Sequence, residues 1–249
     1  MAAEKLPVIE LFGPTVQGEG AMIGHQTMFI RFGGCDFDCF MCDSRHAIDK
    51  DEIKKNAKYL EQHEIYACIE SKKLVAPWVT YSGGNPCLWD LEVLTDLLQR
   101  HLFKVAVETQ GTYFKPWVAK CNVVTVSPKG PGMGEKCDRE LLKNFISHTA
   151  AGMVNTRNNV NLKIVCFEDG DLEFANDLAE EYHTLDIYLS VGNPYLTHSM
   201  VSLTLDEQRR KLLDKFCWLV DEVFGYKALR RARVLPQLHV LAYGNKVGV

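Results

Sequence analysis

Short apolar runs alternate with longer amphipathic segments along most of the chain. The runs are rich in β-branched and aromatic residues, and most end in glycine, proline or small polar residues, which is typical of buried strands that lead into loops. The segments between the runs carry apolar side chains at helical spacing, which predicts amphipathic helices. The chain is therefore expected to alternate between strand and helix from end to end.

Predicted strands and helices follow one another in a regular order. The strands are Val8 to Phe12, which we expect at an edge, Thr27 to Phe32, Trp78 to Tyr81, Lys104 to Glu108, Val123 to Val126, Val160 to Phe167 and Ile187 to Val191. The helices are Asp49 to Lys73, Leu88 to Leu102, a short helical stretch before Val123, Asp138 to His148, Leu172 to His183 and Asp206 to Phe224. Residues 232–249 are expected to close the chain as an extended segment, with apolar parts at Val234-Leu235 and Leu238 to Leu241.

Six strand–helix units with near-continuous apolar strands indicate a parallel sheet covered by helices. This α/β pattern fits a partial or modified (β/α)6 TIM-like barrel, and an open doubly wound sheet is the alternative. No linker rich in proline, glycine or serine divides the chain, so we expect one domain spanning residues 1–249.

Polar clusters follow five of the predicted strands. In a parallel α/β fold the carboxyl ends of the strands meet at one edge, where ligands bind. One such cluster alone is ordinary turn chemistry, but five at the same edge predict a binding site. The clusters are Cys35 to Cys42, Ser82 to Pro86, Glu108 to Gly111, Ser127 to Gly130 and Gly192 to Pro194.

Three cysteines, Cys35, Cys39 and Cys42, lie in the loop after the second strand, residues 33–46. Structural zinc sites are closed by four protein ligands, and His46 is the nearest residue that can complete a Cys3His site. Alternatively, the three thiolates hold a four-iron cluster and leave one iron open to a small molecule. The cysteines alone leave both readings open.

Composition and charge indicate which classes of partner and which cellular compartment the protein has. With 47% hydrophobic residues, 24% charged residues and a net charge of −4, the chain is typical of a soluble globular protein and shows no basic surface for nucleic acid. The basic run Lys227 to Arg233 is expected to be the solvated end of a helix. No apolar run is long enough for a membrane span or a signal peptide. Nine cysteines, an odd number, indicate a reducing compartment, so we expect a cytoplasmic protein in which Cys166 and Cys217 are buried thiols.

Several blocks of residues, in order along the chain, resemble a known group of enzymes. The cysteine loop after a strand, with the pair Gly83-Gly84 at the end of the next strand, resembles the radical S-adenosylmethionine (SAM) superfamily. Within it the chain resembles the 7-carboxy-7-deazaguanine synthases, from about residue 8 to the C-terminus. The blocks that carry this resemblance are Pro14 to Gly20, Arg31, Cys42 to Ser44, Val107 to Thr109, Ser127 to Lys129 and Leu235 to Leu241.

The resemblance implies an enzyme with a radical SAM core. Cys35, Cys39 and Cys42 would hold a 4Fe–4S cluster whose open iron binds SAM, and reductive cleavage of SAM would give a 5′-deoxyadenosyl radical. This radical would abstract a hydrogen from 6-carboxy-5,6,7,8-tetrahydropterin, which contracts to 7-carboxy-7-deazaguanine with loss of ammonia, in queuosine-type deazapurine biosynthesis. Ser44 stands where the family binds Mg²⁺. A flavodoxin or ferredoxin as electron donor and a homodimer are implied in the same way.

The resemblance also implies which residues contact each ligand. Those for SAM are Met41, Cys42, Asp43, Gly84, Ser127, Pro128 and Lys129. Those for the substrate are Val16, Gln17, Gly18, Arg31, Ser82, Glu108, Gln237 and His239.

Several of these residues also have an ordinary structural explanation. Arg31 can pair bidentately with a substrate carboxylate, or simply with a neighbouring acid. Ser44 offers a hard oxygen ligand to Mg²⁺, or a cap to a helix N-terminus. Lys129 can be a surface lysine, and His239 a packed core histidine.

Two positions depart from the pattern of the family. Asn85 stands where a glutamate that contacts the SAM ammonium is usual, and Gln110 stands where asparagine is usual. An amide oxygen at position 85 still accepts a hydrogen bond, but the charge-assisted contact is lost. We therefore expect SAM binding to persist with a weaker contact there, and Asn85 is not among the predicted ligands.

Two other functions compete with this interpretation. One is a different radical SAM reaction, such as glycyl-radical activation of a partner protein, which needs a large partner-binding face that the blocks around Gln17 and Gln237 do not indicate. The other is a non-enzymatic metal-binding module that uses the three cysteines and His46. Anaerobic reconstitution separates them, because a cluster gives a brown protein with about four irons per chain, whereas the module gives a colourless protein with one zinc.

We expect the substitution Cys39→Ala to abolish cluster assembly, because the remaining two thiolates of the motif are too few to hold four irons. Iron content and the brown absorbance after anaerobic reconstitution measure this, with Cys68→Ala, outside the motif, as the control. If Cys39→Ala still turns over with an intact cluster, the ligand assignment is wrong.

Overall fold

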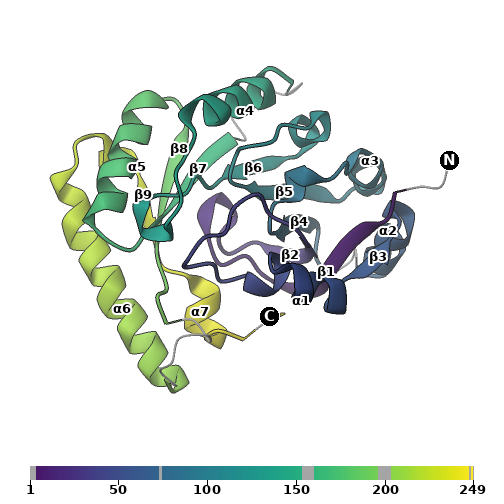
Figure 1. Ribbon diagram of the computed structural model, residues 1–249, viewed down its shortest axis with the longest axis horizontal. Coiled ribbons are helices and arrows are strands. Elements are labelled where there is room, and N and C mark those ends of the chain that lie inside the picture. The colour runs from purple at the N-terminus through teal and green to yellow at the C-terminus, as the bar shows by residue number, and fades with distance from the viewer. Residues whose placement is uncertain (1–3, 73–74, 153–159, 196–202, 247, 249) are drawn as a thin grey trace.

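The computed structural model describes residues 4–72, 75–152, 160–195, 203–246 and 248. Its strands are β1 (Leu6–Val16), β2 (Gln26–Phe32), β3 (Lys58–Leu60), β4 (Trp78–Gly83), β5 (Lys104–Thr109), β6 (Val123–Val126), β7 (Val160–Cys166), β8 (Asp186–Val191) and β9 (Arg233–Leu235). Within the described residues they form one sheet in the order β3-β1-β2-β4-β5-β6-β7-β8-β9 (Figure 1).

The sheet is mainly parallel. From β2 to β9 neighbouring strands are parallel and follow the order of the chain. A doubly wound sheet reverses its order at a switch point, so this arrangement confirms the predicted partial barrel. The prediction that Val8 to Phe12 is an edge strand is wrong at Val8, whereas Glu10, Leu11 and Phe12 pair with β2 alone. β1 lies between β2 and β3, because Leu6, Pro7 and Val8 pair with β3.

Helices cover the outer side of the sheet. They are α1 (Lys50–Asn56), α2 (Gln62–Glu70), α3 (Glu92–Arg100), α4 (Arg139–Gly152), α5 (Asp169–Glu181), α6 (Leu205–Glu222) and α7 (Leu238–Tyr243). Figure 1 shows α3, α4, α5 and α6 in succession around the outside of the sheet, and α7 between α6 and the side that carries β1. Within the described part of the chain, no helix is long and apolar enough to cross a membrane.

Alternation along the parallel strands gives the sheet two different faces. Side chains at one set of alternate positions, such as Val79 and Tyr81 in β4, belong to the hydrophobic core. Positions between them point to the opposite, inner face, and many are polar although buried: Thr80, Ser82, Thr125, Ser127, Lys163 and Ser190. Because buried polar groups need partners, the inner face is the side of the sheet that is suited to bind a polar ligand.

The stretch predicted as one helix from Asp49 to Lys73 forms two helices with a strand between them. The Asp49 side chain accepts from two backbone N–H groups and begins α1, and a capping box of Glu61 and Glu64 begins α2. Between the helices, β3 pairs with the start of β1. The polar composition favours helix, but the caps and the available sheet edge decide the local structure. Lys73 lies outside the described residues.

The closing segment differs from the extended structure predicted for residues 232–249. Among its described residues only β9 is a strand, and Leu238–Tyr243 forms the helix α7. A short apolar run is compatible with strand or helix, and here tertiary contacts decide. Arg209 on α6 donates to the carbonyl oxygens of Leu241 and Ala242 at the end of α7. Residues 247 and 249 lie outside the described residues.

Cys166 is buried as predicted, but the prediction that Cys217 is buried is wrong. Cys217 lies on α6, whose buried positions are Leu212 and Leu219. Leu213, one helical turn before Cys217, is 46% exposed, so both residues lie on the outer side of the helix. Some apolar residues of this segment therefore face the core and others face solvent.

Candidate active site

A cavity of about 680 Å³ opens at the carboxyl ends of the parallel strands, on the inner face of the sheet. The cysteine loop after β2 lines one side, and the β1–β2 connection and the start of α7 line another. Every predicted site residue except Pro128 lies on its wall. They are Val16, Gln17, Gly18, Arg31, Cys35, Cys39, Met41, Cys42, Asp43, Ser44, Ser82, Gly84, Glu108, Ser127, Lys129, Gln237 and His239.

Cys35, Cys39 and Cys42 face this cavity from a single loop. Burial raises the pKa of Cys39 to about 11 and that of Cys42 to about 12, so these thiols are protonated near neutral pH and would release protons on binding a metal. His46 does not join them, since its Nε2 lies 3.2 Å from Glu10 Oε2. Across the described residues, no three His, Cys, Asp or Glu side chains converge closely enough to hold one metal ion.

Glycines at the end of β4 let its backbone lie directly against the cysteine loop. A Cβ at Gly83, where φ is +134°, would lie 2.1 Å from Phe32 O. A Cβ at Gly84 would lie 2.0 Å from Gly34 O. In the space that the glycines leave, the N–H groups of Gly84 and Asn85 donate to Phe32 O and Gly34 O over 3.1 and 2.8 Å. The glycine pair therefore anchors the loop on the end of the strand.

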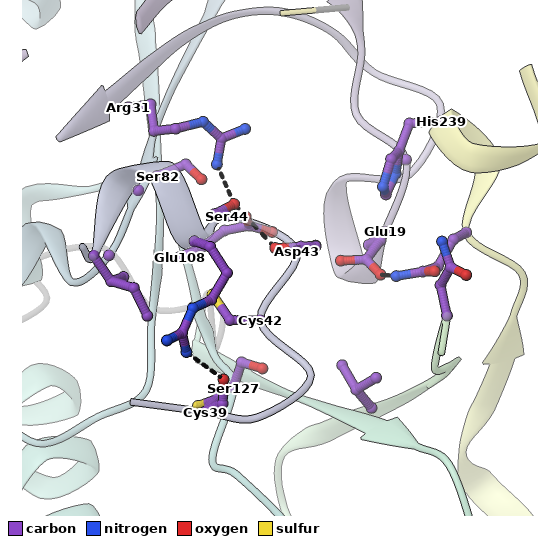
Figure 2. Close-up of a pocket in the computed structure, with 18 of the residues that line it drawn as sticks. Glu19, Arg31, Cys39, Cys42, Asp43, Ser44, Ser82, Glu108, Ser127 and His239 are labelled. Carbon is purple, nitrogen blue, oxygen red and sulfur yellow. Dashed lines mark hydrogen bonds between the residues drawn. The ribbon is translucent and has the colours of Figure 1, made fainter. Parts of the chain in front are cut away.

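A row of charged and polar side chains lies on one side of the cavity. Arg31 donates from Nε to Glu10 Oε2 over 2.6 Å and from Nη1 to Ser44 Oγ over 2.6 Å. Ser44 Oγ in turn donates to Asp43 Oδ1 over 2.9 Å, and Figure 2 shows these side chains joined in a row beside Cys42. Burial would raise the pKa of Glu10, but His46 and Arg31 outweigh it and lower that pKa. The Ser44 side chain makes no capping hydrogen bond to the helical turn after it.

Across the cavity, a buried lysine joins two carboxylates. Lys163 Nζ in β7 lies 2.6 Å from Glu19 Oε2 and 3.6 Å from Glu108 Oε1. Gln237 donates to Glu19 Oε1 over 2.7 Å, and Gln17 donates to Glu108 Oε1 over 3.2 Å. These contacts connect the β1–β2 loop, two strands and the C-terminal segment into one wall, which we call the acidic wall.

The Glu19–Lys163 ion pair of the acidic wall keeps its charges near neutral pH. Burial would raise the pKa of Glu19, but the Lys163 ammonium, His239 and the hydrogen bonds from Lys163 and Gln237 lower it to about 2. Burial would also lower the pKa of Lys163, but Glu108 and Glu19 raise it above its usual value. The acidic wall therefore offers a ligand fixed carboxylate acceptors beside a fixed cation.

The start of α7 completes the acidic wall. The Leu238 N–H donates to Gly18 O over 3.0 Å. His239 packs so closely on Gly18 that a Cβ there would lie 2.2 Å from His239 Nδ1. Glycine at position 18 is therefore required for the C-terminal segment to reach the cavity, and Figure 2 shows His239 beside Glu19.

Of the three SAM contacts predicted at the end of β6, two line the cavity and one does not. Lys129 Nζ donates to Ser127 Oγ over 3.2 Å, and both residues line the cavity. Lys129 is therefore directed inward and is not an ordinary surface lysine. Pro128 between them is buried and is not part of the cavity wall.

Glu10, Glu19 and Lys163 are cavity residues that pair with predicted site residues but are absent from the predicted set. Lys163 is a lone charge inside the apolar strand β7, and a charge in such a strand requires a buried partner. Glu19 stands inside the glycine-rich block that resembles the family. The unexplained charge in the strand and the acid in the glycine-rich block were the signals that could have found this pair.

We expect Lys163→Met to lower the free energy of unfolding by roughly 3–5 kcal/mol, because it leaves Glu19 buried without its cation. Lys120→Met is the matched control. It removes ion pairs of partly exposed side chains with Glu92 and Asp96, and its expected loss is about 1 kcal/mol or less. Denaturant unfolding at pH 7 measures both, and equal losses would contradict a stabilising role for the buried pair.

In the wild-type chain the lowered pKa of Glu19 also sets a pH dependence. Its contribution to stability is complete above the ordinary carboxyl pKa of 4.5 and is lost as the pH falls towards 2. The double variant Lys163→Met/Glu19→Gln should regain part of the stability lost in Lys163→Met and show a shallower loss in acid.

Relatives of known function match nearly the whole chain, although a search of protein-family models found none that matches it. The 7-carboxy-7-deazaguanine synthase of Bacillus cereus is 39% identical over 251 residues, which cover 98% of this chain and 99% of that protein. The Bacillus subtilis protein of the same name is also 39% identical, over 99% of this chain and 100% of its own length.

Solved structures agree with this relationship. QueE from Escherichia coli aligns with a TM-score of 0.60 and 25% identity over 94% of this chain and 95% of its own. SuiB from Streptococcus suis aligns with a TM-score of 0.52 over 84% of this chain and 48% of its own, at 16% identity, which supports the fold alone. With 39% identity over nearly the full length of both proteins, the chain belongs to the 7-carboxy-7-deazaguanine synthase family of radical SAM enzymes.

Proposed function

We propose that the cavity binds a 4Fe–4S cluster, SAM and 6-carboxy-5,6,7,8-tetrahydropterin, and that this chain forms 7-carboxy-7-deazaguanine with loss of ammonia. One observation carries the proposal: three cysteines, an arginine suited to bind a carboxylate and the acidic wall line one cavity. The full-length relatives named for this product support it. The reaction makes the chain a lyase of queuosine-type deazapurine biosynthesis.

Cys35, Cys39 and Cys42 would hold the cluster. The three thiols share one loop and one cavity, and His46, the nearest candidate for a fourth ligand, contacts Glu10 instead. This donor set fits a cluster with one iron open to a small molecule. When bound, the cluster and SAM supply the one-electron chemistry that begins the ring contraction.

Contacts to SAM are proposed from the cysteine loop and the strand ends. Met41 and Asp43 lie on the loop, Gly84 lies at the end of β4, and Ser127 and Lys129 lie at the end of β6. The methionine part of SAM carries an ammonium and a carboxylate, which are complementary to the Asp43 carboxylate and the Lys129 ammonium. Opposite charges on two sides of the cavity would orient SAM along the loop.

We propose that the substrate lies between Arg31 and the acidic wall. Arg31 would share its guanidinium between Glu10 and the substrate carboxylate, since guanidinium presents several donors in one plane. Glu108 keeps 22% of its side chain exposed and can accept from the N–H edge of the pterin ring. Glu19 is already engaged by Lys163 and Gln237. The remaining proposed contacts are Val16, Gln17, Gly18, Ser82, Gln237 and His239.

Ser44 is proposed to bind Mg²⁺. Its hydroxyl lies between Arg31 and Asp43 at hydrogen-bond distances of 2.6 and 2.9 Å, on the side of the cavity where the substrate carboxylate would bind. Mg²⁺ prefers oxygen ligands and keeps several waters, so one hydroxyl and one substrate carboxylate are a sufficient set of non-water ligands.

The cellular setting is proposed on separate grounds. All nine cysteines are unpaired, which supports a reducing, cytoplasmic location. The reaction needs an electron, for which we propose a flavodoxin or ferredoxin as donor. A homodimer and a single domain over residues 1–249 are proposed from the resemblance to the family.

Incubation of the reconstituted chain with SAM, a reductant and 6-carboxy-5,6,7,8-tetrahydropterin tests the proposed function. We expect both 5′-deoxyadenosine and 7-carboxy-7-deazaguanine, detected by chromatography and mass spectrometry, and no deazapurine when the pterin is omitted. Absence of both products from a protein that retains about four irons per chain would overturn the proposal.

Ser44→Ala is expected to weaken the stimulation of product formation by Mg²⁺, because the variant loses the hydroxyl ligand. The rate is measured over a Mg²⁺ titration, with Ser71→Ala, on the exposed surface after α2, as the control. An unchanged Mg²⁺ dependence in Ser44→Ala would remove Ser44 from the metal site.

A further inference from the structure

Asp36 is the centre of a hydrogen-bond cluster on the cysteine loop that the proposed function does not use. Its carboxylate accepts from Asn85 Nδ2 over 2.8 Å and from Thr112 Oγ1 over 2.6 Å. Gln110 Nε2 also donates to Asp36 Oδ1. The three donors come from the loops after β4 and β5, so Asp36 joins the cysteine loop to two strand ends.

Gln110 also donates a hydrogen bond to the sulfur of Cys35. Its Nε2 also lies 3.4 Å from Cys35 Sγ, at hydrogen-bond distance for sulfur. An amide NH2 group carries two hydrogens, so one can point to Asp36 while the other points to the sulfur. Gln110 is 5% exposed, and a hydrogen bond in such a buried place is electrostatically stronger than in water.

Asp36 determines which end of the Gln110 amide faces Cys35. If the amide were turned over, its carbonyl oxygen would lie against both the Asp36 carboxylate and the sulfur, with no donor between them. Asp36 is itself held by Asn85, which is fully buried and whose Oδ1 accepts from Thr109 Oγ1 and the Cys87 N–H. Every polar atom of the Asn85 side chain therefore has a partner, and the orientation is fixed by the fold.

We infer that Gln110 is a positioning residue that tunes the bound cluster through an N–H···S hydrogen bond to Cys35, with Asp36 holding the amide in place. Hydrogen bonds to cluster sulfurs are among the factors that set reduction potentials, because a donor stabilises the extra negative charge of the reduced cluster. Gln110 thus makes the cluster easier to reduce. The inference rests on the proposed function in one respect only, namely that Cys35 is a cluster ligand.

Redox titration of the reconstituted chain, followed by the electron paramagnetic resonance signal of the reduced cluster, tests this inference. Gln110→Met keeps an unbranched side chain of similar length but has no N–H donor. At a fixed solution potential we expect its ratio of reduced to oxidised cluster to fall roughly five-fold, the effect of one net hydrogen bond. Thr112→Val is the matched control, because it removes the contacts of Thr112 to Asp36 and Asn85 but no donor to the sulfur, and its ratio should equal that of the wild type.

Two outcomes would overturn the inference. Gln110→Met with the wild-type ratio would show that the N–H···S contact has no redox effect. A shift in Thr112→Val as large as that in Gln110→Met would show that the loop tether, and not the donor, is responsible. If Gln110→Met does not retain iron, Gln110→Asn, whose amide is one methylene shorter, is titrated with the same criteria. A wild-type chain that assembles no cluster would instead overturn the proposed function, and the inference with it.

Discussion

The buried ion pair between Glu19 and Lys163 is the interaction on which the cavity depends. Two charges removed from water are tolerated only when their remaining hydrogen-bonding groups are also engaged. Glu19 therefore also takes the amide of Gln237, and Lys163 also lies near Glu108. These contacts hold the β1–β2 loop, β7 and the C-terminal segment together. Displacing any one of them would leave a buried charged group, Glu19 or Lys163, without one of its hydrogen-bond partners.

A second set of contacts holds the other half of the site. The cysteine loop rests on the glycine pair at the end of β4 and is connected through Asp36 to Asn85 and Gln110. The loop and the acidic wall share no direct ion pair among the described residues. The cysteine loop and the acidic wall are thus supported by different elements of one sheet, and both line the same cavity.

Periodicity predicted the fold class well, because parallel strands buried on both faces leave near-continuous apolar runs that few other structures require. The predicted site residues could be found for a related reason: they follow strand ends, or lie in blocks that resemble the family. Lys163 was not, because it lies inside a strand, where only the inward direction of its side chain gives it a role. Leu238 to Leu241 and Cys217 were misjudged because a short apolar run does not specify whether it forms strand or helix, or which side of a helix faces the core.

Gln237 and Glu19 are in contact although 218 positions separate them in the chain. Contacts between such distant residues form only after the intervening chain has been ordered. During synthesis, when domains fold progressively from the N-terminus, the cysteine loop and its supporting strands are complete long before the last segment emerges. The cysteine loop can therefore be in place on a nascent chain whose acidic wall is still incomplete, so the cavity is finished only when nearly the whole chain has left the ribosome.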